Sequence, residues 1–229
     1  MVNLMIADDN VSFVESLSYM LTKEEDFRIM DICHNGLETI MDYNSKTPDV
    51  LLLDLNMPGL NKLDVLNNLN SLEKNVIIMS ASNEYRLKLL NMKKVYWVLE
   101  KPFDYKVLFD LIREIRTTQH EENLNEKIDE LLKKLLFDPL TKGTILFKTA
   151  ILMAYKEPKL KLDDIYEEIS IKIPKNVRTM HSTIDKCVAT TVGKHDNINL
   201  FCELFPDFYG DKPTTKQLIR YCLNYLNDI

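Results

Sequence analysis

Residues 50–58 read VLLLDLNMP, an apolar run that ends in an aspartate, Asp54, and passes into a loop. Similar short apolar runs occupy residues 4–7, 76–79 and 95–99, and residues 27–33 are a fifth strand candidate that completes the alternating series. Continuous runs of this kind are typical of strands that are buried on both faces of a sheet. Polar residues stand at or just after the ends of four of the runs. They are Asp8, Asp9, Asp54, Ser80 and Lys101.

Between the predicted strands, apolar residues recur at helical spacing. These stretches contain Phe13, Leu63, Leu89 and Val107. Alternating strands and helices predict right-handed crossovers and an open parallel sheet that is covered by helices. Because ligands of such sheets bind beyond the carboxyl ends of the strands, we expect the polar residues named above to converge there.

Adjacent acids after one strand and a third acid after another would repel each other strongly without a cation. Mg²⁺ suits such a group, since it prefers oxygen ligands and combines one or two carboxylates with phosphate oxygens. The alternative is that Asp8 and Asp9 only cap the following helix. The combination with Ser80 and Lys101 favours a functional site, because a phosphoryl group on Asp54 needs a hydroxyl donor and a cation.

The chain has 229 residues, of which 45% are hydrophobic, and this length suits two domains of ordinary size. The alternating pattern stops near Thr118, and the polar stretch after it is typical of a connector. We predict a first domain over residues 1–118, a linker over 119–127 and a second domain over 128–229. The formal net charge is −5 for residues 1–118, −2 for 119–125 and +1 for 126–229.

No apolar run approaches the roughly 20 residues of a membrane-spanning helix. The first predicted strand begins at once and leaves no room for a signal peptide, so a cytoplasmic protein is expected. The four cysteines show no CxxC pair and no convincing histidine spacing, so we expect them to be reduced and mostly packed. They are Cys33, Cys187, Cys202 and Cys222.

The strands and the polar residues at their ends, Asp8, Asp9, Asp54, Ser80 and Lys101, resemble the receiver domain of two-component response regulators. The resemblance covers residues 1 to about 118. The resemblance implies a flavodoxin-like α/β fold, with a five-stranded parallel sheet in the order 2-1-3-4-5. It implies Asp54 as phosphoacceptor, and a histidine kinase or phosphotransfer protein as donor. The Mg²⁺ ligands would be Asp8, Asp9, Asp54 and the backbone carbonyl of Asn56. Ser80 would be the switch hydroxyl, and Lys101 would bind the phosphate.

The chain departs from the family pattern at two places. The usual Asp-Gly pair after the 54–58 motif is replaced by Asn61 and Lys62, and the usual aromatic three residues before Lys101 is Val98. The coupling of hydroxyl and aromatic that the family uses must therefore depend on other groups here. Trp97 could replace the missing ring, but we expect it to be buried by packing.

The second half has helical periodicity throughout, with prolines between the periodic segments. Residues 124–135 carry a stripe of leucine and isoleucine that could pack on its own domain or pair with a second copy, and packing is the expected role. A helix begins after Pro213, where Thr214 and Gln217 have the spacing of a capping box. We predict an all-α domain.

This half resembles the DNA-binding domain of the stage-zero sporulation regulators, response regulators that control transcription. The resemblance rests on residues 146–155, 172–192, 204–205 and 212–214, and it implies that residues 177–192 form the recognition helix of a helix-turn-helix. Positions that align with the family's arginines hold Thr179, Ser182 and Asp185. The remaining candidate DNA contacts are Arg178, His181, Lys186 and Lys194. Alternatively, these are ordinary surface residues, or in the case of His181 a helix-packing residue.

Two hypotheses follow. In the first, phosphorylation of Asp54 pairs two copies into a homodimer whose helical domains bind adjacent half-sites of DNA. In the second, the chain recognises DNA only weakly and acts by contact with another protein, forming a heteromer with a related regulator or its phosphodonor. The reason is that a helical domain with net charge +1 lacks the strongly basic surface of a DNA binder. An enzyme is not expected, apart from slow hydrolysis of the protein's own acyl phosphate.

Overall fold

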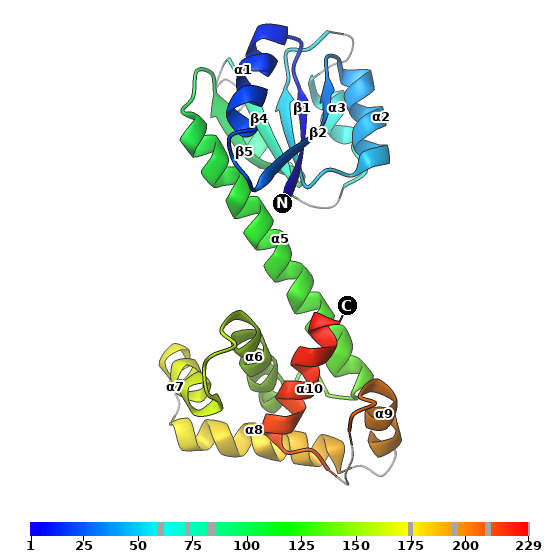
Figure 1. The fold of residues 1–229 in the computed structure, drawn as a ribbon, viewed down its shortest axis with the longest axis vertical. Helices are drawn as coiled ribbons and strands as arrows, with labels where there is room; N and C mark the ends of the chain where they lie inside the picture. Colours follow the sequence, from blue (N-terminus) through cyan, green and yellow to red (C-terminus); the bar gives the residue numbers. More distant parts are fainter. Residues whose placement is uncertain are drawn as a thin grey trace. The chain divides into compact units, whose positions relative to one another are not determined.

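The structure, a computed structural model, describes residues 1–58, 62–71, 74–81, 86–173, 176–193, 197–208 and 212–228. Asn61 and Lys194, both named above, lie outside these ranges. The chain divides into two compact units, Met1–His120 and Glu121–Ile229, and each is described by itself (Figure 1). None of the described helices is both long enough and apolar enough to cross a bilayer.

The first unit contains a five-stranded parallel sheet in the order β2-β1-β3-β4-β5. The strands are β1 (Val2–Ala7), β2 (Phe27–Cys33), β3 (Val50–Asp54), β4 (Val76–Ser80) and β5 (Val95–Glu100). Every residue of β3 and β4 is buried, as their continuous apolar character predicts. The predicted α/β fold, strand order and parallel pairing are therefore confirmed.

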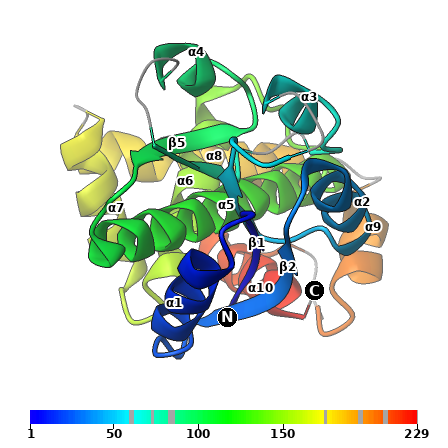
Figure 2. The same cartoon turned by 90° about the horizontal axis from the view of Figure 1, so that it is seen from above.

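Five helices flank this sheet. They are α1 (Val11–Leu21), α2 (Gly36–Lys46), α3 (Lys62–Asn67), α4 (Arg86–Leu90) and α5 (Tyr105–Lys134). The apolar residues of α1 and α5 form one hydrophobic cluster with one face of the sheet. Those of α2, α3 and α4 form a second cluster with the other face, so the sheet is a middle layer (Figure 2).

The sequence pattern did not predict helix α2. Its buried positions include a glycine, Thr39 and Tyr43, which give a weak apolar periodicity. The helix is instead marked by its start, because the side chain of Asn35 accepts a hydrogen bond from the N–H of Glu38 at 2.9 Å. That capping signal was the feature that could have found it.

Helix α1 is capped by Asn10 and not by Asp8 or Asp9. The side chain of Asn10 accepts a hydrogen bond from the N–H of Phe13 at 3.1 Å. Asn10 is therefore the N-cap, and the two aspartates stand before it. The reading of Asp8 and Asp9 as mere helix caps is wrong, because the position that the cap requires is already taken.

The stretch 119–127 was expected to be a linker, but it is helical and lies within α5. It contains no proline or glycine, and most of its residues are compatible with a helix. Leu124 in this stretch is 5% exposed and belongs to the core of the second unit. The division between the units falls inside the same stretch, after His120.

The described part of the second unit is helical, which confirms the all-α prediction. After the end of α5 come α6 (Lys142–Lys156), α7 (Leu162–Lys172), α8 (Val177–Val192), α9 (Asn197–Leu204) and α10 (Thr215–Asn227). Helix α10 begins with the predicted capping box of Thr214 and Gln217. The apolar stripe of residues 124–135 is buried in this unit's core, so its predicted packing role is confirmed.

Helices α6 and α8 approach closely at a glycine. A β-carbon on Gly143 would overlap the side chain of Cys187 in α8, so this crossing requires glycine. All four cysteines are free. Cys33 and Cys222 are buried as expected, whereas Cys202 is exposed.

Candidate functional site

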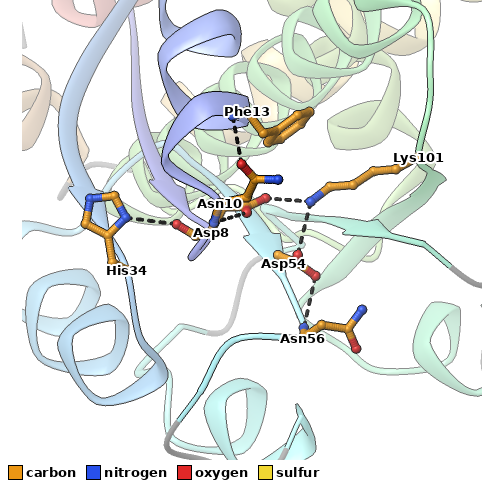
Figure 3. Close-up of polar contacts among 7 residues, drawn as sticks. All are labelled: Asp8, Asn10, Phe13, His34, Asp54, Asn56 and Lys101. Carbon is orange, nitrogen blue, oxygen red and sulfur yellow. Dashed lines mark hydrogen bonds and ion pairs between the residues drawn. The ribbon is translucent and has the colours of Figure 1, made fainter.

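Asp8, Asp54 and Lys101 meet at the carboxyl edge of the sheet (Figure 3). The Nζ atom of Lys101 donates to Asp8 Oδ2 at 2.5 Å and to Asp54 Oδ2 at 3.0 Å. The side chain of Asp8 is fully buried, that of Asp54 is 10% exposed and that of Lys101 is 20% exposed. A single ammonium group therefore faces two largely buried carboxylates, which leaves excess negative charge at the site.

Local hydrogen bonds hold Asp8 in place. Its Oδ1 atom accepts from the N–H of Asn10 at 3.0 Å, so the loop before α1 fixes the carboxylate. Its backbone carbonyl oxygen accepts from Nδ1 of His34 at 3.0 Å, across the loop that follows β2 (Figure 3). Neither contact was predicted. The first is a local bond within one loop, and the second depends on how two loops meet.

The loop after β3 fixes Asp54 in a similar way. The N–H of Asn56 donates to Asp54 Oδ1 at 2.9 Å, which places the backbone of Asn56 beside the carboxylate. Asp9 is exposed at the same edge, and one carboxylate oxygen from each of Asp8, Asp9 and Asp54 lies within 4.8 Å of the others. Oxygen donors at this spacing fit a hard divalent cation such as Mg²⁺.

Strands β4 and β5 bring Ser80 and Lys101 to this edge. The carbonyl oxygen of Ser80 accepts from the N–H of Lys101 at 2.8 Å, and Ser80 is 9% exposed. The peptide bond between Lys101 and Pro102 is cis. The sequence-predicted residues of the first half are thus brought together, with Asn56 contributing through its backbone.

A second group of potential ligands comprises Asp31 and Cys33 of β2 and Asp42 of α2. Lys46 forms ion pairs with both aspartates, so their negative charge is partly neutralised. Burial, reinforced by the neighbouring acids, raises the pKa of the Cys33 thiol to about 12. A neutral thiol is a poor metal ligand, and this group does not compete with the site at Asp54.

The comparisons with known proteins bear on the first unit. Residues 4–113 match the family model of the response regulator receiver domain. These residues are a receiver domain. The match includes both strands that carry the acids and the strand that leads to Lys101.

Solved structures similar to this receiver domain include the CheX-CheY-BeF3-Mg+2 complex from Borrelia burgdorferi. That chain is 28% identical, with a TM-score of 0.44, over 50% of this chain and 88% of its own. The response regulator domain of Thermotoga maritima CheB is 21% identical, with a TM-score of 0.43, over 51% of this chain and 95% of its own. The Francisella response regulator 1452 receiver domain is 22% identical, with a TM-score of 0.45, over 52% of this chain and 99% of its own.

Strand β5 of the receiver domain contains an irregularity next to the missing aromatic. Val76 pairs with Val95 but Ile77 pairs with Trp97, so Tyr96 is an extra residue in β5. Trp97 is therefore turned outward and is 38% exposed, with the guanidinium of Arg86 5.4 Å from its ring centre. The expectation that Trp97 is buried was wrong, because a strict alternation of faces does not hold across the bulge.

Val98 returns to the buried side and is 1% exposed, in the cluster that lies under α2, α3 and α4. Its small side chain carries no ring that could turn between the core and the surface. Tyr96 packs partly on the opposite cluster, and burial together with a hydrogen bond to Glu114 raises its pKa to about 12. Each of these three positions in β5 thus has a different environment.

One face of helix α8, the predicted recognition helix, is exposed. Arg178 and Lys186 lie on it, together with Thr179, Ser182 and Asp185. The opposite face packs into the core of the second unit through Met180, Ile184 and Val188. The basic candidates Arg178 and Lys186 are thus accessible to a partner, whereas Lys194 lies outside the described residues.

Several polar side chains of α8 have partners within the unit. Asp185 Oδ1 accepts from the hydroxyl of Thr215 at 2.5 Å. The hydroxyls of Ser182 and Thr183 donate to the carbonyl oxygen of Thr179 in the same helix. His181 packs against Tyr166 with ring centres 4.0 Å apart. His181 is therefore a helix-packing residue, and the exposed surface of α8 mixes charges of both signs.

Proposed function

We propose that this protein is a response regulator of a two-component or phosphorelay system in which Asp54 accepts the phosphoryl group. The supporting observation is the cluster of Asp8, Asp9 and Asp54 with Lys101 between two of its carboxylates. In the transfer, an Asp54 oxygen forms a bond to phosphorus while the bond from phosphorus to the donor's histidine nitrogen breaks. The donor is a histidine kinase or a phosphotransfer protein.

Each residue has a distinct task in this proposal. Asp8 and Asp9, with Asp54 and the backbone of Asn56, hold Mg²⁺, which supplies positive charge to the phosphoryl oxygens when it is bound. Lys101 supplies a second positive charge, and the hydroxyl of Ser80 supplies a hydrogen bond. The protein is then a phosphoacceptor rather than an enzyme, with slow hydrolysis of its own acyl phosphate.

Mass spectrometry of the intact chain tests this step. Acetyl phosphate with Mg²⁺ is expected to add one phosphoryl group to the wild type and none to Asp54→Asn. Asp64→Asn, which removes an exposed carboxylate from helix α3 at the same change in charge, is a matched control and is expected to be labelled like the wild type. Equal labelling of Asp54→Asn would refute the proposal.

The proposed output is control of transcription through the helical domain, as in the sporulation regulators that it resembles. Helices α7 and α8 are consecutive, and they pack together through Tyr166 and His181. Arg178 and Lys186 then contact DNA from the exposed face of α8, with phosphorylation pairing two copies on adjacent half-sites. Because phosphate contacts release counterions, binding weakens as the salt concentration rises.

The alternative output is contact with another protein, and a specific observation favours it. Asp185 places a negative charge between the two basic residues, and its partner Thr215 keeps it there. An acid at this position opposes binding to phosphates. In this reading the chain pairs with a related regulator or its phosphodonor and modulates it.

A gel-shift assay with genomic DNA fragments at low and moderate salt distinguishes the two outputs. Binding that depends on sequence and on the phosphodonor, and that is lost in Arg178→Ala and Lys186→Ala, supports control of transcription. Lack of binding, with capture of a purified receiver-containing regulator in a pulldown, supports the alternative. Binding that both variants retain would remove α8 as the DNA-contacting helix.

A further inference from the structure

Lys101 has a third close neighbour besides the two carboxylates. Its Nζ atom lies 4.3 Å from the ring centre of Phe13, in the first turn of α1 (Figure 3). At this distance the ammonium is attracted by the negative face of the ring, and the attraction is strong where water is partly excluded. The ring therefore helps to set where the charge of Lys101 lies relative to Asp8 and Asp54.

Phe13 begins a continuous series of aromatic contacts that leads away from the acids. Its ring meets that of Phe103 edge to face at 6.1 Å between centres, and Phe103 meets Tyr105 in the same way at 6.1 Å. Tyr105 stacks on Phe109 at 6.4 Å. We call Phe13, Phe103, Tyr105 and Phe109 the aromatic series.

The aromatic series ends on helix α5. Tyr105 and Phe109 are four residues apart and therefore lie on one face of this helix. Phe109 is 7% exposed and also contacts Phe27 of β2 at 5.5 Å. All of these rings belong to the hydrophobic cluster between the sheet, α1 and α5. Each ring contacts the next, so we expect a shift at one end to change the contacts along the series.

We propose that Phe13 is a positioning residue for Lys101, and that the aromatic series couples the position of the Lys101 ammonium to helix α5. This inference rests on the proposed function, since it needs a phosphoryl group on Asp54. The transferred group carries its negative charge beyond the Asp54 carboxylate, and the Lys101 ammonium moves toward that charge. Its contact with Phe13 then changes, and the ring contacts pass this change to the first turns of α5.

Hydrogen–deuterium exchange of the full-length chain tests the coupling, with and without acetyl phosphate and Mg²⁺. The readout is amide exchange in peptides that cover residues 105–113, and intact mass measures phosphoryl uptake in the same samples. The wild type is expected to change its exchange rate in these peptides by at least about threefold on phosphorylation. Phe13→Leu is expected to lose most of that change while its uptake slows by no more than about fivefold.

Further variants separate coupling from simple destabilisation. Phe109→Leu changes a ring far along the series from the acids and is expected to lose the same response with normal uptake. The double variant is expected to lose no more than either single variant, because both interrupt one series. Phe13→Tyr keeps the ring and is expected to restore the response. Tyr19→Leu removes an exposed ring of α1 outside the series and serves as the matched control.

Two results would overturn the inference. One is a full exchange response in both Phe13→Leu and Phe109→Leu. The other is a wild type that takes up the phosphoryl group without any change in residues 105–113. Failure of the wild type to take up phosphate at all is distinguishable, because the intact mass reports it directly, and it would overturn the proposed function together with this inference.

Discussion

The ammonium of Lys101 lies 2.5 Å from Asp8 Oδ2, although the two residues are 93 positions apart in the sequence. This ion pair ties the end of β1 to the end of β5 across a sheet in which β3 and β4 stand between them. Asp8 is fully buried, so its carboxylate has lost its hydration and depends on the partner. The contact therefore has a structural role as well as the proposed chemical one.

Lys101→Met should destabilise the fold in the absence of divalent cations. It leaves Asp8 and Asp54 without their shared cation, and we expect a loss of roughly 3 kcal/mol in the free energy of unfolding. Mg²⁺ should restore more stability to this variant than it adds to the wild type, since it neutralises the same carboxylates. Urea unfolding with and without Mg²⁺ measures both effects. Lys106→Met, at an exposed position of α5, is the control. If both variants lose the same stability and recover it equally with Mg²⁺, Lys101 is not the shared cation of Asp8 and Asp54.

Two buried tyrosines should respond differently to loss of the hydroxyl group. Tyr43 donates to Asn75 Oδ1 at 2.8 Å, so Tyr43→Phe is expected to cost about 1–2 kcal/mol in the free energy of unfolding. The hydroxyl of Tyr166 has no hydrogen-bond partner among the described residues, so Tyr166→Phe should be neutral or slightly stabilising. Thermal or urea unfolding compares the pair. A similar loss in both would show that Tyr166 has a partner after all.

The ion pair of Arg113 with Asp26 predicts a pH-dependent contribution to stability. Arg113 donates two hydrogen bonds to this carboxylate, at 2.8 and 3.0 Å, and they hold the pKa of Asp26 below its usual value. A carboxylate with a lowered pKa stabilises the fold above its unfolded pKa of about 3.9, and this contribution is lost as the pH falls through the folded value.

Arg113→Met should therefore be less stable than the wild type near neutral pH, and the difference should vanish at an acidic pH at which Asp26 is protonated in both the folded and the unfolded state. Both side chains are more than a third exposed, so the expected difference is less than about 1 kcal/mol. Urea unfolding at the two pH values measures it. A difference of the same size at both would mean that lost packing on Phe27, rather than charge, is responsible.

Asp185 should limit whatever affinity α8 has for DNA. Asp185→Asn keeps an oxygen that can accept the hydrogen bond from Thr215 but removes the negative charge. We expect DNA affinity at low salt to rise by about twofold to fivefold. Glu203→Gln changes the net charge equally at an exposed position of α9 and should have a smaller effect. Equal effects in a salt-controlled gel shift would mean that only net charge matters.

The local sequence predicted four strands because each is an apolar run with a polar residue at its end, and it predicted β2 because it completes the alternating series. It predicted the meeting of Asp8, Asp54 and Lys101 because parallel strands share a carboxyl edge. Helix α2 was missed because its buried residues, Gly36, Thr39 and Tyr43, give only a weak apolar periodicity. The exposure of Trp97 was missed because strict alternation of buried and exposed strand residues does not predict the bulge at Tyr96.

Contacts that depend on the packing of helices were beyond prediction. Phe13 was recognised only as an apolar residue of a helix, and nothing near it in the sequence indicates that its ring faces Lys101. The same is true of Asp185, whose partner Thr215 is contributed by the last helix. These contacts depend on how helices pack, which apolar periodicity does not specify.

The location of the phosphoryl group tests the central claim most directly. The full-length protein is treated with acetyl phosphate and Mg²⁺, digested under conditions that preserve acyl phosphates, and mapped by tandem mass spectrometry, beside Asp8→Ala/Asp9→Ala. We predict a single modified residue, Asp54, in the wild type, with Mg²⁺-dependent labelling that is absent from the double variant. A phosphoryl group on another residue, or undiminished labelling of the double variant, would contradict the account.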